Sequence, residues 1–188
     1  MITLLFVCYL FPLHAQKIVM DKAESDGKRY ISTEQQTIIY GKQNFWGVIT
    51  ETGIGMSLSC VASNNDTTWG IQLCVHEKVQ IDEGRKLLIK LSDNSIITLE
   101  NIEQIGPLDY ETYIGANITV YSVYPLYYVS KNNLLTMLQI GVEKIRIETN
   151  IDYIDRMVKG KTMVDVLRAQ YDNIQEALSK TKDIYTDF

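Results

Sequence analysis

Residues 56–77 read MSLSCVASNNDTTWGIQLCVHE, and this stretch decides the fold that the sequence predicts. On both sides of the turn residues SNND, apolar and polar side chains alternate, as in two half-buried strands of a β-hairpin. The apolar face of the first strand holds Met56, Leu58, Cys60 and Ala62, and that of the second holds Trp69, Ile71, Leu73 and Val75. Opposing these two faces fixes the register of the hairpin.

The same alternation separates the two cysteines of the hairpin. Cys60 falls on the apolar face, whereas Cys74 falls on the other face beside Gln72 and His76. Directly paired residues of a ladder share a face, so this register predicts two free thiols. A shift of one residue would allow a disulfide, which is common in exported proteins.

Further strands are expected on both sides of this hairpin, because segments rich in Ile, Val, Tyr and Thr alternate with short turn signals. These segments are 29–32, 37–40, 45–51, 86–91, 96–100 and 117–124. For the pair 86–91 and 96–100, a three-residue loop at 93–95 would oppose Leu91 to Ile97 and Ile89 to Leu99. This choice keeps the apolar faces together.

Two helices are expected after residue 128. Ser130 can cap a short helix that Gly141 ends, and the strand 142–148 follows it. Thr162 and Asp165 resemble a capping box at the start of a longer helix that runs to about Lys180. The apolar stripe of that helix consists of Val164, Leu167, Tyr171, Ile174 and Leu178. Such a stripe marks an amphipathic helix packed on a sheet.

The first fifteen residues, MITLLFVCYLFPLHA, are typical of a secretory signal peptide with cleavage after Ala15. The apolar run is shorter than the roughly 20 residues of a membrane span. Residues 16–188 are then one exported, strand-rich domain. We expect it in the periplasm or cell envelope, or otherwise secreted.

Composition narrows the range of partners. The net charge is −5, which argues against nucleic-acid binding, and the Lys and Arg residues form no polybasic run in the sequence. Neither metal-binding nor cofactor-binding motifs occur, and no later apolar stretch is long enough for a transmembrane segment. We therefore expect no cofactor and no metal.

Catalytic motifs are equally scarce. His76 is the single histidine after the leader, so a hydrolase would depend on His76 or on carboxylates that no motif identifies. Residues two apart in a strand are about 7 Å apart, which makes activation of Cys74 by His76 awkward. The sequence therefore predicts a surface or structural role for His76.

Six tyrosines are the candidate binding residues. Tyrosine rings offer an apolar face with a polar rim, which suits contact with proteins or sugars, although tyrosine is also a favoured strand residue. The six fall within nineteen residues: Tyr110, Tyr113, Tyr121, Tyr124, Tyr127 and Tyr128.

Two strings resemble a group of uncharacterised, exported, strand-rich proteins of Bacteroidetes. They are KLLIKLSDNSIITL, residues 86–99, and YPLYYVSKNNLLTMLQIGVEKIRIET, residues 124–149. The resemblance spans about residues 86–182. It implies a periplasmic or envelope setting and a sheet closed by C-terminal helices, and it brings no catalytic motif.

The predicted fold is α+β: a mostly antiparallel sheet or open sandwich, with a short helix and a long C-terminal amphipathic helix over one apolar face. The expected function is that of a non-enzymatic exported binding or interaction module with a protein, peptide or glycan partner. One version of it is an envelope immunity or inhibitor protein. The alternative is the hydrolase described above.

Overall fold

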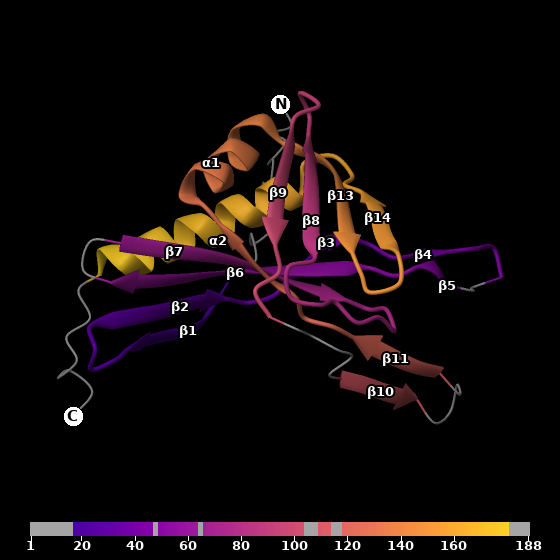
Figure 1. The fold of residues 1–188 in the computed structure, drawn as a ribbon, viewed down its shortest axis with the longest axis horizontal. Helices are drawn as coiled ribbons and strands as arrows, with labels where there is room; N and C mark the ends of the chain where they lie inside the picture. The colour runs from indigo at the N-terminus through magenta and orange to yellow at the C-terminus, as the bar shows by residue number, and fades with distance from the viewer. Residues whose placement is uncertain (1–16, 47–48, 64–65, 104–108, 114–117, 181–188) are drawn as a thin grey trace, which may run out of the picture.

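The computed structural model describes residues 17–46, 49–63, 66–103, 109–113 and 118–180. The expected leader, residues 1–15, lies outside the described residues. Within them, antiparallel sheets and two helices form an open α+β sandwich, as the sequence predicts (Figure 1). No helix of the described residues is long and apolar enough to cross a membrane.

The larger sheet is built around the hairpin that the alternating pattern of residues 56–77 predicts. Its strand order is β1-β2-β6-β7-β12, and β3 also pairs with β6. The strands are β1 (Ile18–Ala23), β2 (Lys28–Thr33), β3 (Gln36–Ile39), β6 (Ile54–Ser63), β7 (Asp66–Val75) and β12 (Leu126–Val129). Cys60 pairs with Trp69 and Met56 with Leu73, so the predicted apolar faces meet.

The smaller sheet has the order β14-β13-β8-β9, and its strands run across those of the larger sheet (Figure 1). Its strands are β8 (Lys86–Leu91), β9 (Ile96–Glu100), β13 (Val142–Glu148) and β14 (Tyr153–Met157). Ile89 pairs with Ile97 rather than with Leu99, so the predicted register is wrong by two residues although the apolar faces still meet. The turn explains the shift, since Asn94 takes a φ of 71° and Leu91 closes on Ser95.

Helix α1 (Lys131–Ile140) begins and ends as the sequence predicts. The Ser130 hydroxyl accepts a hydrogen bond from the Asn133 amide at 3.1 Å, and Gly141 ends the helix with a φ of 95°. Helix α2 (Thr162–Ser179) packs against α1 and against β1, β2, β3 and β6 of the larger sheet. The predicted capping box of α2 is wrong, because Lys161 is the N-cap residue and the Thr162 hydroxyl donates to the Lys159 carbonyl.

The core lies between the two sheets and the buried face of α2. Of the predicted stripe, Val164, Leu167 and Ile174 are buried, while Tyr171 and Leu178 are half-buried at its margin. The buried face also includes Met163, Gln170 and Ala177. The buried face of α2 is therefore rotated around the helix axis relative to the predicted apolar stripe, and it includes Gln170, a polar residue outside that stripe.

Two short hairpins project from this body (Figure 1). One pairs β10 (Asp109–Tyr113) with β11 (Ile118–Ser122), and the other pairs β4 (Lys42–Gln43) with β5 (Ile49–Glu51). The prediction of a strand over 45–51 is therefore wrong for Phe45 and Trp46, which lie in the turn of the second hairpin.

Candidate functional site

The turn of the β4–β5 hairpin exposes two large aromatic side chains. Phe45 is 94% exposed and Trp46 is 83% exposed. Their ring centroids are 5.5 Å apart with an interplanar angle of 84°, an edge-to-face arrangement that aromatic pairs favour. We call this pair the aromatic tip.

Local hydrogen bonds and charges shape the turn that presents the tip. The Asn44 side chain accepts a hydrogen bond from the Trp46 amide at 3.0 Å, the Asx geometry that starts many turns. Lys42 and Glu51, which are opposite one another in the ladder, form an ion pair at 2.7 Å. These contacts fix the backbone of the turn and leave both rings in solvent.

Two glycines join the hairpin to the larger sheet. A Cβ atom at Gly41 would lie 2.9 Å from the carbonyl oxygen of Glu51, and one at Gly53 would lie 3.0 Å from that of Ile39. Such distances leave no room for a side chain, so the two backbones touch where the hairpin leaves the sheet. We call this contact the glycine crossing.

A partly buried polar cluster anchors the base of the hairpin. The Thr52 hydroxyl donates to the Glu77 carboxylate at 2.9 Å, and Arg156 of β14 donates to the same carboxylate oxygen at 3.0 Å. The Arg156 and Glu77 side chains are 12% and 34% exposed, so water screens this pair only in part. The hairpin is thereby tied to both sheets.

The exposure of Phe45 and Trp46 contrasts with the burial of two other large aromatic side chains, Trp69 and Tyr127. Trp69 is 1% exposed and packs 5.3 Å from the Tyr171 ring, and Tyr127 is fully buried. Burying a large apolar side chain is worth about 1.5–3 kcal/mol. Because both rings of the tip stay exposed, folding does not gain the burial free energy of these two side chains, roughly 3–6 kcal/mol.

Three cations lie near the base of the hairpin, and we call them the basic collar: Lys42, Arg156 and Lys159. All three act on Glu51, whose pKa they lower, with the hydrogen bond from Lys42 as the largest cause. A small hollow of about 70 Å³ separates Lys42 and Lys159, and the exposed side chains of Tyr40 and Met157 extend its apolar lining. Aromatic, apolar and basic groups therefore share this end of the molecule.

The sequence analysis did not identify the aromatic tip. Phe45 and Trp46 are strand-forming residues, and they were assigned to a strand for that reason. The signal that could have found them is the pair of turn-forming residues Asn44 and Gly47 on either side, because a turn places its side chains in solvent.

The six predicted tyrosines do not form one surface. Tyr127 is fully buried with a pKa raised by that burial, so it belongs to the core, while its neighbour Tyr128 is 51% exposed on the other face of β12. Tyr121 is half-buried beneath the Lys78 ammonium, 5.0 Å from the ring centroid, and Tyr124 is half-buried. Tyr110 pairs with Tyr121 along the backbone of β10 and β11, and the Tyr110 and Tyr113 side chains lie outside the described residues.

His76 is closer to Cys74 than the backbone spacing suggests. The Cys74 sulfur lies 3.7 Å from His76 Nε2, and His76 Nδ1 lies 2.8 Å from the Ser122 hydroxyl. The expected separation of about 7 Å applies to the backbone, whereas these side chains lean toward one another. Cys74 is nevertheless only 1% exposed, and the Gln35 side chain lies over Gly55, its partner in the ladder. Its expected solvent-facing position is therefore wrong, and the thiol is closed to substrates in this conformation.

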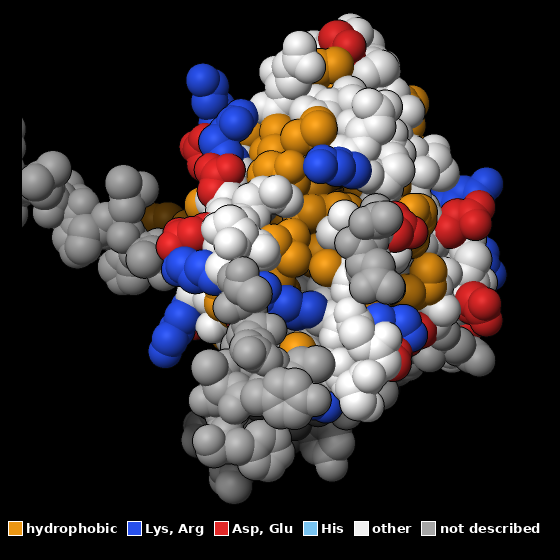
Figure 2. Space-filling view, turned by 90° about the vertical axis from the view of Figure 1, so that its left-hand side faces the viewer, with side chains coloured by type: hydrophobic (Ala, Val, Ile, Leu, Met, Phe, Trp, Pro, Cys, Tyr) orange, Lys and Arg blue, Asp and Glu red, His pale blue; other side chains and the backbone are white. Residues whose placement is uncertain are grey.

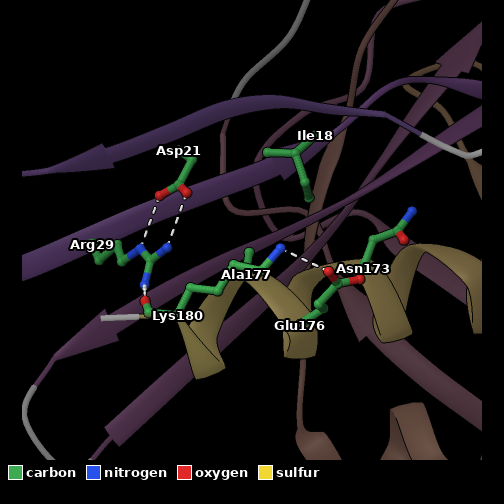
Figure 3. A pocket seen from close by; sticks show the side chains of 7 residues that line it. All are labelled: Ile18, Asp21, Arg29, Asn173, Glu176, Ala177 and Lys180. Carbon is green, nitrogen blue, oxygen red and sulfur yellow. Dashed lines mark hydrogen bonds and ion pairs between the residues drawn. The ribbon is translucent and has the colours of Figure 1, made fainter. Parts of the chain in front are cut away.

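A hollow of about 390 Å³ lies between β1, β2 and the C-terminal end of α2 (Figure 3). Arg29 donates to both carboxylate oxygens of Asp21 and to the Lys180 carbonyl, and Lys180 pairs with Glu176 at 2.7 Å. This end of the molecule shows apolar side chains surrounded by charged ones (Figure 2). Since the charged groups that line the hollow pair with one another, they stabilise the end of α2 rather than form a ligand site.

Within the part of the chain that the structure describes, no group of three or more His, Cys, Asp or Glu side chains could hold a metal ion. In comparisons with known proteins, no family model, no curated protein and no solved structure matches the chain. The aromatic tip is therefore the candidate functional site on its own geometry.

Proposed function

We propose that the protein is a non-enzymatic exported binding module and that the aromatic tip is its binding element. The observation that carries this proposal is the exposure of Phe45 and Trp46, at 94% and 83%, in a chain that buries Trp69 and Tyr127. Aromatic anchors of this kind dominate the energetics of many binding surfaces.

The construction of the hairpin supports the proposal. A tip that has to bind must be held in position before it meets its target, since ordering it on binding would reduce affinity. The Asn44 turn, the ion pair of Lys42 with Glu51 and the cluster of Thr52, Glu77 and Arg156 supply that order.

The alternative, a hydrolase that uses His76, has one observation in its favour: the contacts of His76 with Cys74 and Ser122. The burial of the Cys74 sulfur weighs against it. The two functions predict different outcomes for a variant that lacks the imidazole. A binding module keeps its function in His76→Ala, whereas acid–base catalysis by histidine would lose about 100-fold or more in rate.

The test measures how much of the exported protein stays with the cell envelope after fractionation. We expect the wild-type chain to sediment with the envelope and the double variant Phe45→Ser/Trp46→Ser to remain in the soluble fraction. His76→Ala should behave like the wild type.

A matched control removes a different adjacent pair of exposed apolar side chains. Val19 and Met20 of β1 are 60% and 44% exposed, and β1 lies on the opposite side of the molecule in Figure 1 from the β4–β5 hairpin. Val19→Ser/Met20→Ser should sediment like the wild type. Equal partitioning of the tip variant and the wild type would contradict the proposal.

A further inference from the structure

We infer that the surface entered by the aromatic tip is the interface of an anionic lipid bilayer, an inference that rests on the tip being the binding element. The shape of the tip, the chemistry of its rings and the charges behind them support this inference.

The tip is narrow. Two aromatic side chains bury about 150–250 Å² each, so the pair offers roughly 300–500 Å². A stable protein interface buries about 800 Å² on each partner. A bilayer needs no complementary pocket, so a narrow projecting tip can enter it where a protein would require a broader surface.

The chemistry of the two rings suits the interfacial region of a bilayer. Tryptophan is enriched at membrane interfaces, where its apolar ring meets acyl chains and its N–H group remains among polar groups. Phenylalanine beside it adds apolar area without a polar group. The edge-to-face arrangement of Phe45 and Trp46 presents both rings at the end of the hairpin.

Lys42 of the basic collar lies a short way behind the rings. It is three residues from Phe45, so the backbone separates them by at most about 10 Å, within the depth to which interfacial segments enter the headgroup region. Lys159 lines the same hollow as Lys42 and makes no ion pair within the described residues. Cations at this level attract anionic headgroups.

This collar is a product of the fold. Lys42 belongs to the hairpin, whereas Arg156 and Lys159 come from β14 and the segment after it, more than a hundred residues later. Glu51 and Glu77 lie among them, but Lys42 and Arg156 pair with these carboxylates, which reduces their repulsion of an anionic surface. The three cations outnumber the two carboxylates by one, so these five groups together carry one net positive charge.

The experiment uses vesicles of phosphatidylcholine and phosphatidylglycerol in a 3:1 ratio, with the full chain and its variants in parallel. Any contribution of residues 1–15 is then common to all samples. We expect the wild type to cosediment with the vesicles, and Phe45→Ser/Trp46→Ser to lose at least about 100-fold in affinity. Val19→Ser/Met20→Ser is the matched control and should bind like the wild type.

Fluorescence locates the contact. The chain has two tryptophans, and subtracting the spectrum of Trp46→Phe from that of the wild type isolates the emission of Trp46. That emission should shift to shorter wavelength with vesicles and be quenched by lipids brominated on their acyl chains. An unchanged Trp46 spectrum in the presence of bound vesicles would overturn the inference.

Charge variants test the collar. Lys159→Gln should weaken binding to the anionic vesicles by about fivefold, the effect of one cation near such a surface, and added salt should weaken the wild type. Lys131→Gln on α1 removes an exposed lysine elsewhere and should have little effect. Equal binding to pure phosphatidylcholine vesicles would show that the collar plays no part and would overturn the anionic preference.

The outcomes separate this inference from the proposed function. If envelope association depends on the tip but vesicles do not bind, the lipid inference is wrong and the tip binds a protein or glycan. If neither depends on the tip, both proposals fail.

Discussion

The side-chain nitrogen of Gln170 lies 3.1 Å from the carbonyl oxygen of Met56, at the place where β6 changes partners from β2 to β3. The same nitrogen donates to the carbonyl of Glu34 at 3.1 Å, and Gln170 is fully buried. In the same gap, the Thr33 hydroxyl accepts a hydrogen bond from the Leu58 amide and donates one to the Leu58 carbonyl. Two side chains thus replace the ladder hydrogen bonds that the gap between β2 and β3 removes.

We predict that Gln170→Leu lowers the free energy of unfolding by about 1–3 kcal/mol, because it removes the donor to the carbonyl of Met56, in a buried hydrogen bond, and to that of Glu34, in a partly buried one. Gln175→Leu makes the same change on the half-buried side of α2 and should cost less than about 0.5 kcal/mol. Urea unfolding of both variants measures the difference. Equal effects would mean that the amide of Gln170 does not bridge the gap.

Leu167 is fully buried on the face of α2 that covers the larger sheet. Leu167→Ala should therefore lower the free energy of unfolding by about 2–5 kcal/mol, through lost burial and a residual cavity. Gln175→Ala should change it by less than about 0.5 kcal/mol. If thermal or urea unfolding gives similar small effects for both, α2 does not pack as described.

The two cysteines of the central hairpin should remain free thiols. Cys60 pairs with Trp69 and Cys74 with Gly55, so the two lie on opposite faces, and burial raises the pKa of Cys60 to about 11. Because the thiolate is the reactive form, we predict slow alkylation of both thiols in the native protein and fast alkylation after unfolding in guanidinium chloride. Peptide mapping by mass spectrometry assigns the label, and a native peptide joined through Cys60 and Cys74 would contradict the register.

Asp155 should make part of the stability depend on acid pH. Hydrogen bonds from Arg146 and Lys144 lower its pKa from 3.8 to about 2. A lowered pKa in the folded state adds stability above pH 4, and this contribution is lost as the pH falls from about 4 toward 2. The shift corresponds to at most roughly 2 kcal/mol, which solvent screening of a side chain that is 30% exposed reduces to about 1 kcal/mol.

The variant that tests this is Asp155→Asn. We expect it to be less stable than the wild type at pH 7 by that amount, and equally stable near pH 2, in urea unfolding across the pH range. Asp172→Asn on α2 is the charge-matched control. A difference that stays constant from pH 7 to pH 2 would contradict the assignment.

The sequence predicted the central hairpin because its alternation is unusually regular. The apolar faces, the separated cysteines and the position of both helices all follow from local periodicity, and the structure confirms them. The register of β8 and β9 and the N-cap of α2 depend on local turn and cap geometry, whereas other failures depend on contacts between distant segments.

Gln170 illustrates this limit. Its polarity places it outside the predicted stripe, and only the gap between β2 and β3 gives it a reason to be buried. The gathering of Lys42 with Arg156 and Lys159 likewise depends on segments that lie far apart in the sequence. Aromatic propensity likewise assigned Phe45 and Trp46 to a strand, although the Asn44 turn places them in solvent.

The glycine crossing has a consequence for how this chain can diversify. Ile39 and Ile54 are paired in the larger sheet immediately before and after residues 40–53, and the two backbones touch at Gly41 and Gly53. Because the two ends of this segment lie next to each other in the fold, a short turn could replace residues 40–53 and leave the pair of Ile39 and Ile54 intact. Substitutions, insertions or grafted loops beyond the crossing would change the proposed binding element while the pair of Ile39 and Ile54 stays in place.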